Sequence, residues 1–384
     1  MDDSGGVTSP ALFDQLRRAP DVEGPDLVAV DATDRLLLDE AAALFPRCGP
    51  GEVLVVDDGY GALTLGAVAL HGATDVQVWL DLLVGERALR GNAERVGLGG
   101  SFRVSPFPGG SDAVAPVAPR LVLVQAPKGL EALREIAEAV AQVAHPEVTV
   151  LVGGRIKHMT HAMNDVLRAS FTDVSATLAR QKSRVLVARG PVPGPSSFPR
   201  RQEHPDVGLT VCAHGAAFGG TKVDLGTRAL LAALAAAPQS AGTALDLGCG
   251  TGILATVLAR ISPGRRVLAV DQSAAAVASA AATAEANGVA DAVTVVRDDA
   301  ADSLPAGSVD LVVCNPPFHV GAAVVTTAAD RLFAAAARVL RPGGELWTVY
   351  NSALRYKPEL ARTVGPTRVV DQTPKFTVTV STRR

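Results

Sequence analysis

Residues 244–252, Ala-Leu-Asp-Leu-Gly-Cys-Gly-Thr-Gly, form a glycine-rich loop at the end of a short apolar run. Residues 253–260 follow with the apolar spacing of a helix, so the stretch predicts a strand, a tight turn and a helix. Gly248, Gly250 and Gly252 allow unusual φ angles and the close approach of a bulky ligand. A plain turn between a strand and a helix would show the same glycines. The stretch therefore predicts an α/β fold, and the residues around it must identify the ligand.

The position of the third glycine favours S-adenosylmethionine over NAD. Dinucleotide-binding proteins use the pattern G-x-G-x-x-G, whose third glycine allows close helix packing. Ile253 holds that position in this chain, and the glycine comes one residue earlier. Asp246 adds a carboxylate that can reach a cationic amino acid moiety but would repel a pyrophosphate. We therefore expect S-adenosylmethionine as the cofactor and S-adenosylhomocysteine as its product.

Two later strands end in acidic residues that suit the same ligand. Residues 266–271 predict a strand that ends in Asp271, about 20 residues after the glycines, where a carboxylate can accept hydrogen bonds from ribose hydroxyls. Residues 293–296 predict a third strand, after which a polar side chain such as Asp299 and a backbone N–H such as that of Ala300 can contact an adenine edge. The alternatives are a solvated acid at the first position and a simple acidic turn at the second.

A second motif, Asn-Pro-Pro-Phe, follows the buried-type strand predicted over residues 309–314. Pro316 and Pro317 stop this strand and fix the direction of the preceding carbonyl. The amide oxygen of Asn315 and the Pro316 carbonyl can both accept hydrogen bonds from one exocyclic amino group, while Phe318 offers a ring for base stacking. This arrangement would aim the nitrogen lone pair at a sulfonium methyl. The motif predicts methyl transfer to a planar amine by alignment, without a strong base.

Length and composition indicate a soluble protein of two domains. The chain has 384 residues, of which 48% are hydrophobic and 20% charged. Its four cysteines lack Cys-x-x-Cys spacing, which indicates reduced thiols in a cytoplasm and neither disulfides nor a zinc site. The first residues lack the parts of a signal peptide, and no stretch approaches the roughly 20 apolar residues of a membrane helix. We expect a cytoplasmic monomer that binds no metal and no membrane.

Five prolines predict an extended linker over residues 191–207, between domains at residues 1–190 and 208–384. The first 190 residues have a net charge of −6 (18 − 24), and the remaining residues have +3 (18 − 15). Residues 331–384 alone carry 10 basic and 3 acidic side chains. This basic run can neutralise phosphates, or it can be an ordinary solvated surface.

The first half of the chain repeats the plan of the second. Residues 53–63 again predict a strand, a glycine loop and a helix, and Gln125 ends a later strand at the place of Asn315. The separations from the acid to the amide are 68 (125 − 57) and 69 (315 − 246), which favours gene duplication. The expected matches of Asp246, Gly248 and Gly250 are Asp57, Gly59 and Gly61.

The first copy lacks several features of the second, so we expect that it has lost catalysis. It has no third glycine, and Ala126 and Lys128 replace the first proline and the aromatic residue of the second motif. A degenerate copy can be retained to position RNA or to support the active half. The candidates for an RNA-facing surface, with ordinary surface charge as the alternative, are Arg155, Lys157, His158, Arg180, Lys182 and Arg184.

Over nearly its whole length the chain resembles the bacterial ribosomal RNA guanine-(2-amino) methyltransferases that have an inactive first domain and an active second one. The resemblance rests on Asn315-Pro-Pro-Phe-His319, on Arg-Pro-Gly-Gly-Glu-Leu-Trp-Thr-Val-Tyr-Asn at residues 341–351, on Lys375-Phe376 and on Val-Asp-Leu-Gly at residues 223–226. Asp-Ala-Thr-Asp-Arg-Leu-Leu at residues 31–37, and Pro127-Lys128, look closer to the members that modify large-subunit rRNA.

The resemblance implies two tandem Rossmann-like class I methyltransferase domains with seven-stranded, mostly parallel sheets, the N-terminal one degenerate. It also implies methylation of one guanine in 23S rRNA, protein-free or in a partly assembled subunit. The expected catalytic residues are Asn315, Pro316, Pro317 and Phe318. The expected cofactor-binding residues are Asp224, Asp246, Gly248, Gly250, Gly252, Asp271, Gln272, Asp299, Ala300 and Asn315.

One departure and several alternatives stay open. Phe-Gly-Gly-Thr at residues 218–221 replaces the Phe-Ser-Arg usual in that loop, and Lys222 is the candidate substitute for the arginine. His319 can contact the RNA or cap the next helix. The same chemistry on 16S rRNA, methylation of a protein glutamine or a DNA adenine, and a non-catalytic RNA-binding scaffold are the alternative functions.

Overall fold

The protein folds into two compact units, Met1–Phe198 and Pro199–Arg384. The computed structural model describes residues 9–24, 26–108, 117–236, 242–316 and 322–384. Each unit contains one seven-stranded sheet with helices on its faces, which confirms the expected tandem α/β domains.

The sheet of the second unit is mostly parallel. Its strands are β10 (Thr243–Leu247), β11 (Arg266–Asp271), β12 (Val293–Arg297), β13 (Val309–Cys314), β14 (Leu340–Asn351), β15 (Thr367–Gln372) and β16 (Phe376–Thr382). The spatial order is β12-β11-β10-β13-β14-β16-β15. Neighbours from β12 to β14 pair in parallel, whereas β16 is antiparallel to both of its neighbours. The predicted strands at 266–271 and 309–314 have the predicted bounds.

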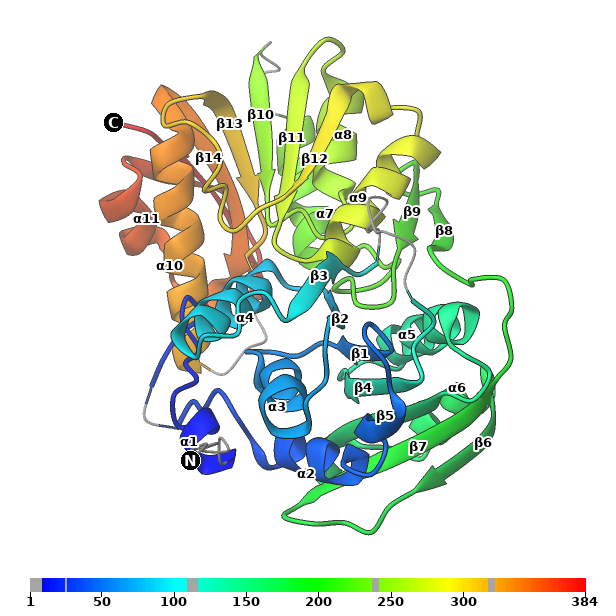
Figure 1. Ribbon diagram of the computed structural model, residues 1–384. Coiled ribbons are helices and arrows are strands. Elements are labelled where there is room, and N and C mark those ends of the chain that lie inside the picture. Colours follow the sequence, from blue (N-terminus) through cyan, green and yellow to red (C-terminus); the bar gives the residue numbers. More distant parts are fainter. Residues whose placement is uncertain (1–8, 25, 109–116, 237–241, 317–321) are drawn as a thin grey trace. The chain divides into compact units, whose positions relative to one another are not determined.

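Two layers of helices bury the two faces of this sheet, because successive strand residues point to opposite sides. In β10, Ala244 packs in the cluster formed with α7, α8 and α9, whereas Leu245 packs in the cluster formed with α10 and α11. Figure 1 shows α10 and α11 together on one side of β13 and β14. The helices are α7 (Leu225–Ala235), α8 (Ile253–Ile261), α9 (Ala274–Ala286), α10 (Ala322–Val339) and α11 (Lys357–Thr363).

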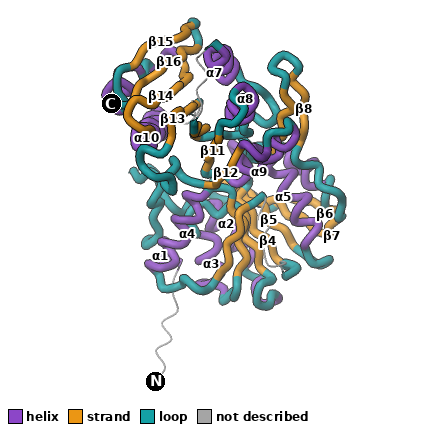
Figure 2. The backbone as a smooth tube through the Cα atoms, turned by 90° about the horizontal axis from the view of Figure 1, so that it is seen from above, coloured by secondary structure: helices purple, strands orange, loops and turns teal. Residues whose placement is uncertain are grey.

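The first unit repeats this arrangement. Its strands are β1 (Val53–Val56), β2 (Val76–Leu80), β3 (Phe102–Pro106), β4 (Leu121–Gln125), β5 (Thr149–Arg155), β6 (Phe171–Ala176) and β7 (Ser183–Pro191), in the order β3-β2-β1-β4-β5-β7-β6. Its helices are α1 (Ser9–Phe13), α2 (Ala32–Ala41), α3 (Ala62–His71), α4 (Leu83–Arg95), α5 (Leu130–Val143) and α6 (Ala162–Arg168). The tube in Figure 2 shows the strands of this unit as a layer flanked by helices.

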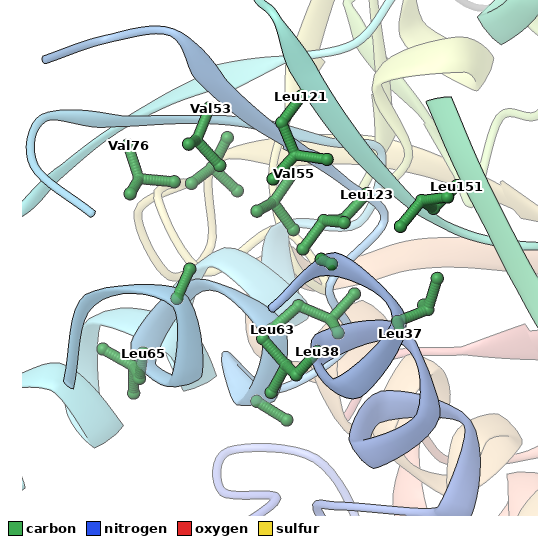
Figure 3. Close-up of a cluster of buried hydrophobic side chains, with 14 of the residues drawn as sticks. Leu37, Leu38, Val53, Val55, Leu63, Leu65, Val76, Leu121, Leu123 and Leu151 are labelled. Carbon is green, nitrogen blue, oxygen red and sulfur yellow. The ribbon is translucent and has the colours of Figure 1, made fainter. Parts of the chain in front are cut away.

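The core of the first unit is apolar on both faces of its sheet. Figure 3 shows one of these cores, in which side chains of the central strands meet leucines of α2 and α3. Leu54 and Val56, which alternate with Val53 and Val55, pack on the other face with α5 and α6. Burial on both faces explains why β1 has a continuous apolar sequence in place of an alternating one.

Pairing between the strands corrects the predicted alignment of the two copies by two residues. Val56 pairs with Trp79 as Leu247 pairs with Val270. In each copy the amide of the next residue donates to the carbonyl of that paired residue. Asp57 N donates to Trp79 O, and Gly248 N donates to Val270 O, each at 2.9 Å. Asp57 therefore corresponds to Gly248, and the expected match of Asp57 with Asp246 is wrong.

The same alignment places Gly61 opposite Gly252, since each is the left-handed residue before its helix. The prediction failed because similar spacing cannot identify the corresponding residue: Val55 stands where Asp246 stands, and its separation from Gln125 is 70 (125 − 55), as close to 69 as the 68 counted from Asp57. The match of Gln125 with Asn315 is confirmed. Leu123 pairs with Val55 in the first unit, as Val313 pairs with Asp246 in the second. Gln125 and Asn315 each lie two residues after these paired residues.

Residues 192–199 lie between β7 and a hairpin that belongs to the second unit. The strands of the hairpin are β8 (Arg200–His204) and β9 (Leu209–Ala213). β9 packs along α9, where Cys212 N donates to Thr283 Oγ1 at 3.0 Å. Part of the stretch expected to be an extended linker is therefore a paired strand.

Candidate functional site

A pocket of about 740 Å³ opens at the carboxyl ends of the central strands of the second unit. Ligands of open α/β sheets bind at this edge. The segments that line it follow β10, β11, β12, β13 and β14, and include the start of α7 and the loop before it. The predicted site residues that it brings together are Asp224, Gly248, Gly250, Asp271, Gln272, Asp299, Ala300, Asn315 and Pro316.

Two glycines expose their backbone to this pocket. Gly248 and Gly250 have φ angles of 75° and 52°, which side chains rarely allow. Among the described residues, no heavy atom lies within 4 Å of the position that a Cβ would take at either glycine. The space in front of the loop is therefore open to a ligand that contacts the backbone.

Gly252 serves the packing of two helices. A Cβ at this position would lie 2.7 Å from both Cα and Cβ of Ala280 in α9. Gly252 thus allows α8 to approach α9, whereas the third glycine of dinucleotide-binding loops allows its helix to pack closely on a strand. It is not among the residues that line the pocket, so its contact with a cofactor stays a prediction.

Asp246 lies beneath the glycine loop and does not line the pocket. Its Oδ2 accepts a hydrogen bond from Ala255 N at 2.9 Å, and its Oδ1 is buried without a partner among the described residues. Burial raises the pKa of Asp246 to about 7, and the nearby Asp271 carboxylate adds to the effect. The structure gives Asp246 a role in anchoring α8, and direct contact with a cationic ligand stays a prediction.

Asp271 and Gln272 present acceptors at the end of β11. Asp271 Oδ2 accepts from Gly250 N and Oδ1 from Ser273 N, each at 3.0 Å, so this acid also holds the glycine loop. Gln272 Oε1 is buried and accepts no hydrogen bond from the described residues. An unpaired buried acceptor is costly, so its place in the pocket lining suits a ligand that donates.

The acidic turn after β12 contains one structural acid and one paired acid. Asp298 Oδ2 accepts from Ser303 N at 2.9 Å and from Ser303 Oγ at 2.7 Å. Asp299 Oδ2 accepts from Arg331 Nη2 of α10 at 2.7 Å. Ala300 follows with φ 51°. The turn is thus fixed from both sides, with Asp299 and Ala300 in the pocket lining.

β13 delivers Asn315 and Pro316 to the pocket, as predicted. Asn315 Nδ2 donates to Thr227 Oγ1 at 3.0 Å and to Asp224 Oδ2 at 3.2 Å. Asn315 Oδ1 is buried and has no hydrogen-bond partner among the described residues. The amide is therefore held by its nitrogen, with its oxygen left as an acceptor. Pro317, Phe318 and His319 lie outside the described residues, so their roles stay predictions.

Asp224 is the N-cap of α7 and already has several partners. Its Oδ1 accepts from Gly226 N at 2.7 Å and from Thr227 N at 3.0 Å, and its Oδ2 accepts from Thr227 Oγ1 at 2.6 Å. These bonds account for the Asp that precedes α7, because N-cap acids satisfy free amides in the first helical turn. Contact between Asp224 and a cofactor stays a prediction.

Sequence reasoning missed several residues of the pocket. Thr227 was not distinguished, because a Thr in the first turn of a helix shows no sign of the partner it meets 88 residues later. Arg331 comes from α10 and reaches the turn after β12 by tertiary contact. The family resemblance included Asn351 and Phe376 but did not place them. Both line the pocket, and they face each other across paired strands β14 and β16.

The altered loop before α7 also reaches the pocket. Phe218, Gly219 and Lys222 are in its lining, and Phe218 is 70% exposed. The β8 strand fixes the next part of the loop, since Thr221 Oγ1 donates to Gln202 Oε1 at 2.7 Å. Lys222 is placed where a cation can contact a ligand, and its role as the substitute for the missing arginine stays a prediction.

The predicted basic surfaces lie at two places. In the second unit, Arg331 and Lys375 line the pocket. In the first unit, β5 and β7 bring Arg155 and Arg184 to one end of the sheet, and Ile156 N donates to Lys182 O at 3.0 Å. Contact of either surface with RNA stays a prediction.

Within the described ranges, no helix has the length and apolar character needed to span a bilayer. The same residues contain no group of three or more His, Cys, Asp or Glu side chains arranged for a metal ion.

Family comparisons cover both units. The family described as "RLMG N-terminal domain" matches residues 7–191, and "Methyltransferase small domain" matches residues 208–380. The T. thermophilus 16S rRNA N2 methyltransferase solved with AdoMet and guanosine is 24% identical, with a TM-score of 0.72 over 92% of each chain, which supports the tandem fold.

Curated relatives match over nearly the whole chain. Ribosomal RNA large subunit methyltransferase G of Pseudomonas aeruginosa (strain UCBPP-PA14) is 36% identical over 94% of this chain and 96% of its own. The protein of the same name from Streptomyces avermitilis is 34% identical over 97% of both chains. Identity and coverage at this level show that the chain belongs to the family of ribosomal RNA large subunit methyltransferase G.

Proposed function

We propose that this protein transfers a methyl group from S-adenosylmethionine to the exocyclic 2-amino group of a guanine in ribosomal RNA. The observation that carries the proposal is the arrangement of Asn315. Its Nδ2 donates to Thr227 and Asp224, while its Oδ1 is a buried acceptor without a partner among the described residues. An exocyclic amino group of a base is the kind of donor that would satisfy it.

The residues of the pocket fit S-adenosylmethionine. A volume of about 740 Å³ lies within the range of pockets that bury small ligands. The open backbone at Gly248 and Gly250 suits the amino acid part, and the free acceptor of Gln272 suits a hydroxyl donor. S-adenosylmethionine supplies an electrophilic methyl group on its sulfonium. We expect Asp271 to contact the ribose, and Asp299 and Ala300 to border the adenine.

Alignment is the expected source of most of the rate. An amine conjugated to a base is a poor nucleophile, so its lone pair must be directed at the methyl carbon. Asn315 Oδ1 and the Pro316 carbonyl would accept hydrogen bonds from the two N–H groups of the amine and thereby orient the nitrogen. The nitrogen would form its bond to the methyl carbon as the sulfur–methyl bond breaks and S-adenosylhomocysteine leaves. It would then lose one proton to water, so these residues need not act as bases.

The choice of RNA follows the relatives. The relatives with 34–36% identity are named for the large ribosomal subunit, which favours 23S rRNA. The solved methyltransferase with the tandem fold acts on 16S rRNA, which keeps the small subunit as the second candidate. We expect the target guanine to be extruded from single-stranded or protein-free RNA, because unpairing a base costs a few kcal/mol.

The two parts of the chain have different expected roles. We propose that the second unit, with its β8–β9 hairpin, is the catalytic domain, that residues 192–199 form the connection, and that residues 1–190 form a domain that positions RNA or supports the active half. We further expect a monomer that works in the cytoplasm.

The test is methyl transfer from labelled S-adenosylmethionine to protein-free large-subunit rRNA, to small-subunit rRNA and to assembled subunits. Nuclease digestion then identifies the labelled nucleoside. We expect 2-methylguanosine from protein-free large-subunit rRNA. Label in 2-methylguanosine from 16S rRNA alone would change the subunit, and absence of label from every RNA would overturn the proposal.

The matched variant is Asn315→Ala, which removes the free acceptor. We expect methyl transfer to fall to background, while the dissociation constant for S-adenosylmethionine stays within about threefold, because this side chain is assigned to the acceptor amine. Methylation at the parent rate would show that another group orients the amine.

A further inference from the structure

We propose that Thr227, with Asp224, is a positioning residue that sets which way the Asn315 amide faces. The inference rests on the proposed function, in which the amide oxygen must face the substrate amine. It concerns Thr227, which lies on α7 and would act on the reaction only through Asn315.

A chain of hydrogen bonds with one direction joins the three side chains. Asn315 Nδ2 donates to Thr227 Oγ1 at 3.0 Å, and Thr227 Oγ1 donates to Asp224 Oδ2 at 2.6 Å. A carboxylate only accepts hydrogen bonds, so the threonine hydroxyl must be the donor in its bond to Asp224. Its oxygen is then left as an acceptor, which admits the NH₂ end of the amide and excludes the carbonyl end.

The reversed amide would fail on both sides. Asn315 Oδ1 would face Asp224 Oδ2 and Thr227 Oγ1, so three acceptor oxygens would share the single threonine proton, which already lies in the bond to Asp224. Its NH₂ group would face the pocket, where it would meet the amino group of the proposed substrate as donor against donor. Reversal therefore removes the acceptor that orients the amine.

Burial differs along this chain and identifies the residue to test. Thr227 is 5% exposed, whereas Asp224 lies at the surface. Water can replace part of what an exposed carboxylate contributes, but it cannot easily replace a buried hydroxyl that is hydrogen-bonded to Asn315. The effect of removing the hydroxyl should therefore be larger than that of removing the charge.

The first copy provides an independent observation. Its α2 starts with the N-cap Asp31, as α7 starts with Asp224, and Asp34 follows three residues later, as Thr227 does. Gln125, the counterpart of Asn315, donates through Nε2 to Asp34 Oδ1. An oxygen from the first turn of the helix thus holds the amide nitrogen in both copies, although neither side chain of the pair is the same.

The experiment compares Thr227→Val with Thr227→Ser in the full chain, assayed on the RNA that the parent protein methylates. Valine keeps the shape and removes the acceptor, so we expect kcat to fall about tenfold or more. The dissociation constant for S-adenosylmethionine and the melting temperature should stay near the parent values. Serine restores the acceptor and should recover most of the turnover.

Thr256→Val is the matched control for a buried threonine in a helix. Thr256 is fully buried in α8, and its Oγ1 has no hydrogen-bond partner among the described residues. Its replacement should leave kcat unchanged. A fall in kcat for Thr256→Val as large as that for Thr227→Val would assign the effect to packing and overturn the inference.

Other outcomes separate the inference from the proposed function. Parent turnover by Thr227→Val would overturn the inference and leave the function standing. A weaker affinity for S-adenosylmethionine with unchanged kcat would also overturn it, because Thr227 would then act on the cofactor. No 2-methylguanosine from the parent protein would overturn the proposed function and the inference with it.

Discussion

The two seven-stranded units share a topology and differ at the edge where ligands bind. Asp57 stands in the first unit where Gly248 stands in the second, so the first unit carries a side chain at a position where the second leaves the backbone open. Leu80 stands in the first unit where Asp271 stands in the second. The Leu80 carbonyl accepts from Phe107 N, and the Asp271 carbonyl accepts from Asp298 N, in each case from the residue that follows the neighbouring strand. The first unit thus lacks one of the two open glycines, since Gly59 remains open where Gly250 stands, and it lacks the acid expected to bind ribose.

The two units also differ where the first turn of the helix before the central strand meets the last strand of the sheet. Gly226 in the second unit leaves room for Phe376, whose ring would lie 3.3 Å from a Cβ at that glycine. The first unit has Thr33 and Ser183 at these places, and their hydroxyls are 3.0 Å apart in a hydrogen bond. A small polar contact therefore closes the space that an aromatic ring lines in the second unit.

One feature survives in both units at different chain positions. Asp246 accepts from Ala255 N in the second unit, and Asp58 accepts from the corresponding Thr64 N in the first. Burial raises the pKa of both acids. A buried acid that anchors the helix after the loop is thus kept where catalysis is not expected, which supports a structural role for Asp246.

The fold and the site depend on different residues. The fold needs apolar residues on both faces of the central strands, and both copies retain them. The site needs open backbone and unpaired acceptors, and the pocket of the second unit is lined with both. Substitution of second-unit residues by their first-unit counterparts therefore tests the assignment directly.

The largest effect is expected for Asn315→Gln, which installs the residue of the first copy. The added methylene displaces the amide oxygen by about 1 Å, and misplacement of that size costs roughly 10²-fold in turnover. Steady-state methylation of rRNA measures it. Gln125→Asn in the first unit is the control and should not change kcat, and a rate for Asn315→Gln within twofold of the parent would contradict the proposed alignment.

A smaller effect is expected for Asp271→Leu, which again copies the first unit. The variant loses the acceptor expected for ribose and the bond from Gly250 N, so S-adenosylmethionine should bind about tenfold to a hundredfold more weakly. Isothermal titration calorimetry measures the affinity. Asp291→Leu, an exposed acid in the turn before β12, is the control; equal affinities for the two variants would remove Asp271 from the cofactor site.

Gly252→Ala tests packing beneath the loop. The new methyl would lie 2.7 Å from Ala280 at a φ of 75°, so the free energy of unfolding of the second unit should fall by about 2 kcal/mol. Trp347 is in this unit, and its fluorescence during urea unfolding reports the change when Trp79 is replaced by Phe.

Gly264→Ala is the control for backbone strain alone, because Gly264 has φ 86° and no described heavy atom near its Cβ position. It should cost less, about 1 kcal/mol. If both alanine variants lost the same stability, the contact of α8 with α9 would not require a glycine.

The last prediction concerns the pH dependence of stability. Burial raises the pKa of Asp246 from 3.8 to about 7, so the folded protein keeps a proton that the unfolded chain releases. This contribution to stability is complete below about pH 4 and is lost as pH rises toward 7. Asp246→Asn should flatten the decline by at most about 1.4 kcal/mol per pH unit.

The measurement is urea unfolding followed by Trp347 fluorescence between pH 4.5 and pH 7.5. Asp58→Asn changes the corresponding acid of the first unit and should leave the Trp347 transition unaltered. Parallel curves for the parent and Asp246→Asn would show that Asp246 is ionised throughout this range in the folded protein.

Local patterns in the sequence predicted several elements of the second unit and their types. Strands at 266–271 and 309–314 were found with their bounds, because continuous apolar runs ending at Asp271 and before Pro316 are local signals. The glycine loop and the Asn-Pro motif were placed at one edge of one sheet, because parallel strands of an α/β fold direct their carboxyl ends to the same side.

Only the tertiary structure decided the contacts between distant residues. It moved the alignment of the two copies by two residues, placed Asp246 beneath the loop, and joined Thr227 to Asn315. Such contacts depend on strand register and on how far a helix approaches the sheet. These distances are set by packing of the whole unit, and no local pattern in the chain records them.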